Sequence, residues 1–218
     1  MKENKTKIKI CGLRRLKDIE IVNELKPDYI GFVFTKSPRQ IDFKQAKILK
    51  DKLDKDILAV GVFVNSDIED IIYLIKNNII SIVQLHGDED EEFIAEIKEF
   101  DNDIKIIKAI EIKNDSLKEF NDEFRNDGLK KYGAEIKKWE DSNVDYLLLD
   151  SGKGSGKTFN WRVIGDVKKP FFLAGGISSE NIIDASKINP FAIDISSGAE
   201  KNGFKSYKKI NKIINKLK

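Results

Sequence analysis

Residues 146–161 read YLLLDSGKGSGKTFNW, and this stretch decides how the rest of the chain is interpreted. An apolar run leads directly to Asp150, and a glycine-rich segment that contains Gly152, Gly154 and Gly156 follows it. A short apolar run bounded by glycines is typical of a strand that is buried on both faces. Asp150 is therefore predicted to lie where a buried strand ends and a loop begins, which is a place suited to chemistry.

The glycine-rich segment SGKGSGKT is one residue short of a P-loop, because Ser151 stands where the leading glycine belongs. A P-loop would place Lys157 and Thr158 on nucleotide phosphates and magnesium. It would also pass directly into a helix, whereas here the chain first reaches Asn160, a good N-cap for a helix that opens at Trp161. We therefore disfavour a nucleoside triphosphatase. The other alternative to a functional loop is a solvated turn that binds no ligand.

Composition narrows the class of protein. The 218 residues suit one domain that spans the chain, 1–218. Lys and Arg total 39 and Asp and Glu total 37, so no broad basic field indicates a nucleic-acid partner. The apolar runs are too short for a membrane span, and MKENKTK lacks the core of a signal peptide, so a cytoplasmic location without membrane contact is expected. The single Cys11 and the single His86 exclude an internal disulfide and leave no ligand set for structural zinc.

Apolar segments alternate with segments of helical spacing along the whole chain. Strands are predicted over residues 7–11, 29–34, 58–64, 82–86, 105–112, 146–150, 171–174 and 191–196. Helices are predicted over residues 13–25, 42–53, from Asn65 or Ser66 to 76, from an acidic first turn at 88–92, over 180–187, and over a closing amphipathic segment from Tyr207 to Leu217. Alternating strands and helices call for a parallel sheet covered by helices, and eight such units close into a (β/α)8 TIM barrel. An open doubly wound sheet is the alternative.

Residues 114–143 interrupt this alternation. They are mostly polar, with a few apolar residues at loosely helical spacing. We predict a longer or broken helix that is interrupted near Gly128 or Gly133. The segment holds too few apolar residues for a core of its own, so we interpret it as a helical insertion and not as a second domain.

In a barrel of this kind the active site lies at the carboxyl ends of the strands. The side chains expected there are Cys11, Arg39, Gln84, His86 and Asp150. Glycines and serines follow the seventh and eighth strands, and their backbone N–H groups suit a phosphate: Gly175, Gly176, Ser196, Ser197 and Gly198.

Three of these candidates also have a plainer interpretation. A lone cysteine such as Cys11 is often a small buried hydrophobe, although beside Gly12 at a strand end it could be an accessible thiolate. His86 fits a structural histidine, because nothing in the sequence pairs it with a nucleophile. Arg39 fits a surface charge, although its place after Pro38 in a short loop suits a carboxylate clamp.

Motifs along nearly the whole chain resemble the phosphoribosylanthranilate isomerase family of tryptophan biosynthesis. They are KICG (9–12), GFVF with SPR (31–39), GVFVN (61–65), VQLHG (83–87), LLLD (147–150), GSGKTFNW (154–161), AGGI (174–177) and DISSGAE (194–200). Departures from the family pattern are mild. Asn160 stands where an aspartate is usual, Ser206 replaces an acid, and the segment 114–143 is longer than usual.

This resemblance implies an Amadori rearrangement of a phosphosugar, in which N-(5-phosphoribosyl)anthranilate becomes 1-(2-carboxyphenylamino)-1-deoxyribulose 5-phosphate. It implies Asp150 as the acid, Cys11 as the base and Arg39 as the partner of the anthranilate carboxylate. The other candidates and Gly156 would hold the substrate, without metal or cofactor, and other tryptophan-pathway enzymes are left open as partners. Two alternatives remain. One is the histidine-pathway aminoaldose isomerase, which would be expected to carry an acid at the position of Cys11; the other is a non-catalytic barrel that binds phosphate.

Strand alternation gives one further prediction. If Cys11 points into the barrel mouth, Lys9 also points inward, because side chains two residues apart share a face. A buried ammonium needs a partner. The eighth strand pairs with the first when the barrel closes, so we predict an ion pair between Lys9 and Asp194 beneath the site, with Ser196 above it. The pair would favour the Cys11 thiolate only weakly.

Overall fold

The computed structural model describes residues 5–112, 132–151, 161–164 and 167–217. The predictions for Gly128, Gly156, Lys157, Thr158 and Asn160 lie outside these residues.

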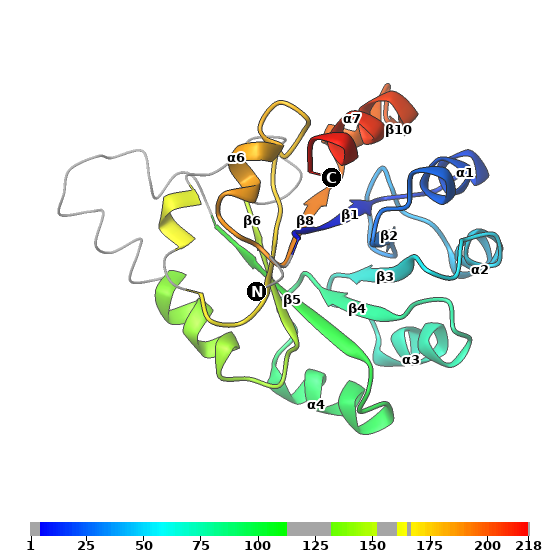
Figure 1. Ribbon diagram of the computed structural model, residues 1–218. Coiled ribbons are helices and arrows are strands. Elements are labelled where there is room, and N and C mark those ends of the chain that lie inside the picture. Colours follow the sequence, from blue (N-terminus) through cyan, green and yellow to red (C-terminus); the bar gives the residue numbers. More distant parts are fainter. Residues whose placement is uncertain (1–4, 113–131, 152–160, 165–166, 218) are drawn as a thin grey trace.

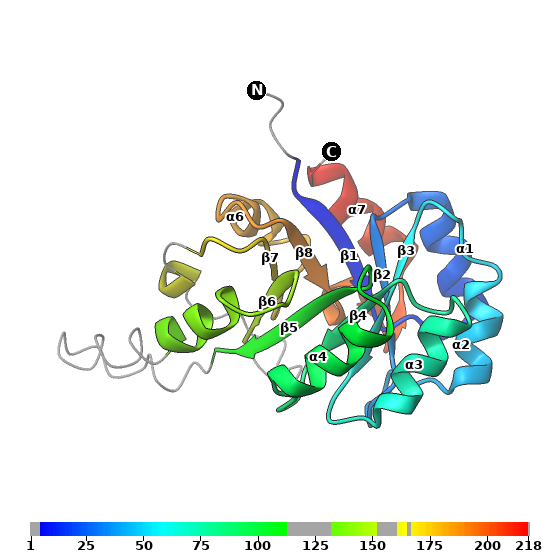
Figure 2. The same ribbon diagram turned by 90° about the horizontal axis from the view of Figure 1, so that it is seen from below.

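Eight parallel strands form a closed barrel in which each strand pairs with the next and β8 pairs with β1. The barrel is visible in Figure 1 and, turned by 90°, in Figure 2. The strands are β1 (Lys7–Cys11), β2 (Tyr29–Val33), β3 (Leu58–Phe63), β4 (Ile82–Leu85), β5 (Lys105–Glu111), β6 (Tyr146–Asp150), β7 (Phe171–Leu173) and β8 (Ala192–Ile195). This confirms the predicted TIM barrel, and closure rules out the open sheet.

Helices surround the barrel on its outside (Figure 1). They are α1 (Leu16–Leu25), α2 (Phe43–Lys50), α3 (Ile68–Lys76), α4 (Glu91–Phe100), a helix over residues 132–140, α6 (Ile182–Ser186) and α7 (Tyr207–Leu217). Gly133 lies inside the helix at 132–140 and does not interrupt it, while most of the predicted insertion falls outside the described residues. Within the part of the chain that is described, no helix is long and apolar enough to cross a bilayer.

The barrel interior is built in layers, because every second residue of each strand faces inward. An apolar layer fills the end where the strands begin, and it includes Tyr29, Phe172 and Ile107. The rings of Tyr29 and Phe172 meet edge to face at 5.5 Å. A polar layer with Lys9 follows, and Cys11 lies above it towards the carboxyl ends. The side chains between strands and helices form the larger apolar core.

The starts of α1 and α3 differ from prediction. α1 begins at Leu16 and not at residue 13, since the buried Asp18 carboxylate accepts hydrogen bonds from the N–H groups of Arg14 and Arg15. α3 is preceded by Asp67 and not by Asn65 or Ser66, and Asn65 has a left-handed φ of 48°.

Three other elements after β6 also differ from the sequence prediction. Trp161–Ile164 forms a 3-10 helix where an α-helix was expected, and α6 begins at Ile182 and not at residue 180. The sequence analysis did not find the short antiparallel hairpin of β9 (Glu200–Lys201) and β10 (Phe204–Lys205).

Candidate active site

One cavity of about 160 Å³ opens at the carboxyl ends of the strands. It brings together most of the residues that the sequence singles out: Cys11, Arg39, Gln84, His86, Asp150, Gly175, Gly176, Ser196 and Ser197. Gly198 does not line the cavity but lies directly beyond Ser197. Because these residues come from β1, β4, β6 and the loops after β2, β4, β7 and β8, barrel closure and strand alternation together assemble the site.

The floor of this cavity contains the predicted ion pair. The Lys9 ammonium lies 2.7 Å from Asp194 Oδ2, and the Lys9 side chain is fully buried. Lys9 also donates a hydrogen bond to Gln84 Oε1 at 2.8 Å. Burial lowers the pKa of Lys9, but the charges of Asp194 and Cys11 outweigh it and raise the pKa above its ordinary value. The contact between Lys9 and Asp194 confirms the predicted ion pair and with it the predicted parity of β1.

The Cys11 thiol is buried and not freely accessible, with the residue 8% exposed. Burial raises the pKa of Cys11, and the nearby ammonium groups of Lys9 and Lys205 lower it by less. The weak effect predicted for Lys9 therefore has the expected sign but does not decide the balance. Space for the thiol depends on Gly31 of β2, because a Cβ there would lie 2.6 Å from Cys11 Sγ.

A polar chain links the floor to Asp150 at the opposite side of the mouth. Gln84 Nε2 lies 3.1 Å from Nδ1 of His86. The other ring nitrogen, Nε2, lies 3.5 Å from Asp150 Oδ2. His86 thus lies beside a catalytic candidate, a contact that no motif or spacing in the sequence indicates.

Arg39 is held in the site by a partner that is far away in the sequence. Its Nε and Nη2 lie 2.7 and 2.9 Å from the two carboxylate oxygens of Glu200 in β9. The buried Lys205 of β10 donates to the same carboxylate at 2.8 Å and to the Ser196 carbonyl. Nη1 of Arg39 has no hydrogen-bond partner among the described residues, so one edge of the guanidinium remains for a ligand. Two cations around one carboxylate also leave a net positive charge.

Glu200 and Lys205 are functional candidates that the sequence analysis missed. Glu200 belongs to the motif DISSGAE, but neither spacing nor composition indicates that it pairs with Arg39. The short strands that bring it there lack the length and alternation from which a strand can be recognised.

The glycines after β7 and β8 have backbone conformations that suit an exposed run of N–H groups. Gly175 and Gly176 have φ of 89° and 59°, in the left-handed region that favours glycine. A Cβ at Gly198 would lie 2.0 Å from the Ile177 carbonyl oxygen, so only glycine permits this approach of the two loops. The amides of Gly176 and Ser197 make no hydrogen bond within the described chain, which leaves them available to an anion.

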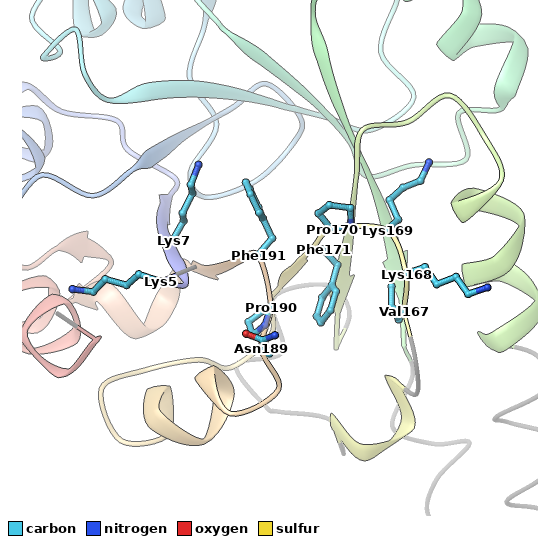
Figure 3. A pocket seen from close by; sticks show the side chains of 10 residues that line it. All are labelled: Lys5, Lys7, Val167, Lys168, Lys169, Pro170, Phe171, Asn189, Pro190 and Phe191. Atoms are coloured by element: carbon cyan, nitrogen blue, oxygen red, sulfur yellow. The ribbon is translucent and has the colours of Figure 1, made fainter. Parts of the chain in front are cut away.

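A larger cavity, of about 400 Å³, lies where β1, β7 and β8 begin, at the opposite end of the barrel. Figure 3 shows that its lysines Lys5, Lys7, Lys168 and Lys169 point in different directions. The Lys7 ammonium contacts the Tyr29 hydroxyl at 3.2 Å, and Lys169 donates to two backbone carbonyls. The ammonium groups therefore do not converge on one point, and among the described residues that line this cavity there is no counterpart of Cys11 and Asp150.

Comparisons with known proteins point to one family. The family model "N-(5'phosphoribosyl)anthranilate (PRA) isomerase" matches residues 8–216. The N-(5'-phosphoribosyl)anthranilate isomerase of Clostridium acetobutylicum is 40% identical, over 97% of this chain and 98% of that protein. The crystal structure of the Thermotoga maritima phosphoribosyl anthranilate isomerase is 32% identical with a TM-score of 0.80, over 97% of this chain and 98% of that chain.

A further solved structure of a phosphoribosyl anthranilate isomerase has a TM-score of 0.78 and is 30% identical, over 97% of this chain and 98% of that chain. That protein is in complex with reduced 1-(o-carboxyphenylamino)-1-deoxyribulose 5-phosphate.

Proposed function

The chain belongs to the N-(5'-phosphoribosyl)anthranilate isomerase family and is an isomerase of tryptophan biosynthesis, and from this premise we propose which of its residues carry out the reaction. Asp150 acts as the general acid and Cys11 as the general base. Arg39 holds the anthranilate carboxylate, and the amides of Gly176, Ser197 and Gly198 hold the phosphate.

The reaction needs two proton transfers at different atoms of the sugar. Asp150 protonates the furanose ring oxygen while the bond from that oxygen to C1 breaks, and the nitrogen lone pair forms the imine. Cys11 removes the proton from C2, which gives an enol that rearranges to the ketone when C1 is protonated. Both steps use groups that must be positioned on either side of one sugar, which is the arrangement that general acid–base catalysis requires.

One observation carries the proposal: Cys11 of β1 and Asp150 of β6 line the same cavity, with Arg39 and the glycine amides around them. Arg39 supports recognition of a carboxylate, because its unpaired Nη1 and the net positive charge of Arg39, Glu200 and Lys205 favour an anion. The phosphate site is supported by its place after β7 and β8, where this fold commonly binds phosphate.

The test compares Cys11→Ser and Asp150→Asn with the parent enzyme in an assay that follows the loss of fluorescence of the anthranilate adduct. Each variant should lose about two orders of magnitude or more in kcat while its circular dichroism stays unchanged. Asp184→Asn is a matched control, because Asp184 is an exposed residue whose ion pair is with Lys187. Near-normal turnover in Cys11→Ser or Asp150→Asn contradicts the assignment.

A parallel assay with the histidine-pathway aminoaldose, in which chromatography separates substrate from ketose product, addresses the alternative substrate. Cys11 stands where that related isomerase is expected to carry an acid, so we expect no measurable turnover. Turnover of both substrates that depends on Cys11 would widen the proposed substrate class to aminoaldose phosphates.

We further propose that the chain works as one domain in the cytoplasm, on a small phosphosugar and without a membrane or nucleic-acid partner. A free thiol supports this location, because Cys11 must stay reduced to act as a base and cytoplasmic thiols are kept reduced. Association with other tryptophan-pathway enzymes stays a prediction, which size-exclusion chromatography of the mixed enzymes would test.

A further inference from the structure

We propose that Lys9, acting through Gln84, holds His86 as the neutral tautomer with its proton on Nε2, and that this ring positions the carboxyl group of Asp150 for proton donation. Lys9, Gln84 and His86 are positioning residues in this account. The proposal rests on the assignment of Asp150 as the acid, but its first part concerns the free enzyme and is measured without substrate.

The first step is the orientation of the Gln84 amide. An ammonium group has only donors, so the Gln84 atom that faces Lys9 at 2.8 Å must be the carbonyl oxygen Oε1. The reverse orientation would set the amide N–H groups against the ammonium. The Gln84 NH2 group therefore faces His86, with Nε2 at 3.1 Å from Nδ1.

The second step is the tautomer of His86. Gln84 Nε2 can only donate, so Nδ1 must accept and carries no proton. A neutral imidazole with an unprotonated Nδ1 has its proton on Nε2. That nitrogen lies 3.5 Å from Asp150 Oδ2, so the ring nitrogen that carries the proton is the one nearer the carboxyl group.

The third step is the rigidity of the chain of contacts. Lys9 is fixed from β8 by Asp194 at 2.7 Å, and both Lys9 and Gln84 are buried. The Lys9 ammonium cannot turn to water, so it keeps Gln84 Oε1 as one of its acceptors. The orientation of Gln84 is thus imposed by the floor of the barrel and not by solvent.

The loop after His86 is also fixed, by a second buried ion pair. Lys108 Nζ lies 3.0 Å from Glu89 Oε2 and donates to the Gly87 carbonyl at 2.8 Å. Glu89 in turn accepts from the Gly87 N–H at 2.9 Å. The backbone on both sides of the imidazole is held, so the ring keeps its place beside Asp150.

This arrangement has a consequence for proton donation. A donor at Oδ2 leaves Oδ1 as the oxygen that carries the proton to the sugar, and it stabilises the carboxylate that remains afterwards. The contact of 3.5 Å is long in the free enzyme, and we expect it to shorten when substrate closes the cavity, as such contacts commonly do. Gln84 therefore acts on the acid through His86 and needs no contact with the substrate.

The test uses the fact that His86 is the only histidine of the chain. In enzyme labelled with 15N-histidine, the two ring-nitrogen signals can be assigned without ambiguity. The parent enzyme should show an unprotonated Nδ1 and a protonated Nε2 at neutral pH. A protonated Nδ1 in the parent enzyme overturns the proposal, whatever any variant does.

Gln84→Glu is the informative variant, because it replaces the donor that faces His86 with an acceptor of the same shape. Nδ1 should then become protonated, either in the other neutral tautomer or in the imidazolium. Gln40→Glu is the matched control: Gln40 is exposed and the change in charge is the same, so the ring signals should stay as in the parent. Unchanged signals in Gln84→Glu would show that Gln84 does not set the tautomer.

The link to Asp150 is tested by kinetics. Gln84→Glu should lower kcat by between about tenfold and a hundredfold, with a small effect on KM, because the acid is misplaced and the anion contacts remain. In the Asp150→Asn background the same change should have little further effect, since the group it positions is gone. An equal loss in both backgrounds would contradict action through Asp150, while the tautomer result would stand by itself.

Discussion

The buried pair of Lys9 and Asp194 makes a sharp prediction about stability. Lys9 is 0% exposed and its ammonium has Asp194 Oδ2 at 2.7 Å and Gln84 Oε1 at 2.8 Å. Removing one partner of a buried pair leaves an uncompensated charge, which typically costs about 3–5 kcal/mol. Lys9→Met and Asp194→Leu should therefore each lower the free energy of unfolding by about that amount.

The double variant Lys9→Met/Asp194→Leu should cost much less than either single change. It removes both charges and leaves apolar side chains of similar volume, which is often neutral or stabilising. If each single change costs about 4 kcal/mol and the double change about 1 kcal/mol, the coupling energy is about 7 kcal/mol, well above the 0.5–3 kcal/mol of ordinary contacts.

Urea denaturation followed by circular dichroism measures these free energies, provided that the denaturant slope stays constant among the variants. Single variants that cost less than about 1 kcal/mol, or costs that simply add in the double variant, would refute the reasoning. The pH dependence is a second check. Because the pKa of Lys9 is raised above 10.5, the contribution of the pair is present below that pH and is lost as the pH rises through the raised value.

Three further predictions concern the mouth of the barrel. Since burial raises the pKa of Cys11 above 9.0, kcat/KM should increase with pH at least up to pH 9, and a plateau near neutral pH would contradict a buried thiol as the base. Gly31→Ala should lower kcat and cost about 1–3 kcal/mol of stability, because the new Cβ would meet Cys11 Sγ at 2.6 Å; unchanged melting and turnover would show that the strands can separate. Burial favours the neutral form of Glu200, but Arg39 and Lys205 hold its pKa at about 2, so its stabilisation is lost as the pH falls from 4.5 towards 2. Glu200→Gln should reduce the loss of stability between pH 4.5 and 2 and raise KM. An unchanged loss of stability over that range would contradict the pairing of Glu200 with Arg39 and Lys205.

The inward-facing residues of the barrel were predictable, because side chains alternate between the two faces of each strand and barrel closure then fixes which strands are neighbours. Knowing that Cys11 faces the mouth fixes Lys9, and barrel closure then brings β8 beside β1 with Lys9 opposite Asp194. This pairing can therefore be predicted from the sequence without any coordinates. The same rule places Gln84 of β4 and His86, directly after β4, on one inward face, although the sequence alone does not indicate that His86 reaches Asp150.

The loops were less predictable, because residues far along the chain decide their conformation. Asn65 looks like a helix cap, but its N–H donates to the carboxylate of Glu89. That carboxylate is held in place by an ion pair with Lys108 of β5. Arg39 looks like an isolated charge, yet its partner Glu200 is 161 residues away. Nothing in the neighbouring sequence indicates such a pairing. The sequence can therefore identify the candidate residue but not the atoms that it contacts.

The polar layer beneath the site raises the question of why a barrel core contains a charged pair at all. Apolar residues at both positions would cost little or even stabilise the fold, so stability alone does not account for Lys9 and Asp194. Their position does account for them, because the Lys9 ammonium fixes Gln84 and thereby the proton of His86. The double variant Lys9→Met/Asp194→Leu separates the two explanations. An enzyme that is as stable as the parent but slower, with a mixed His86 tautomer, would show that the pair is retained for catalysis. A stable double variant with parental turnover and an unchanged tautomer would show that the charges merely compensate each other.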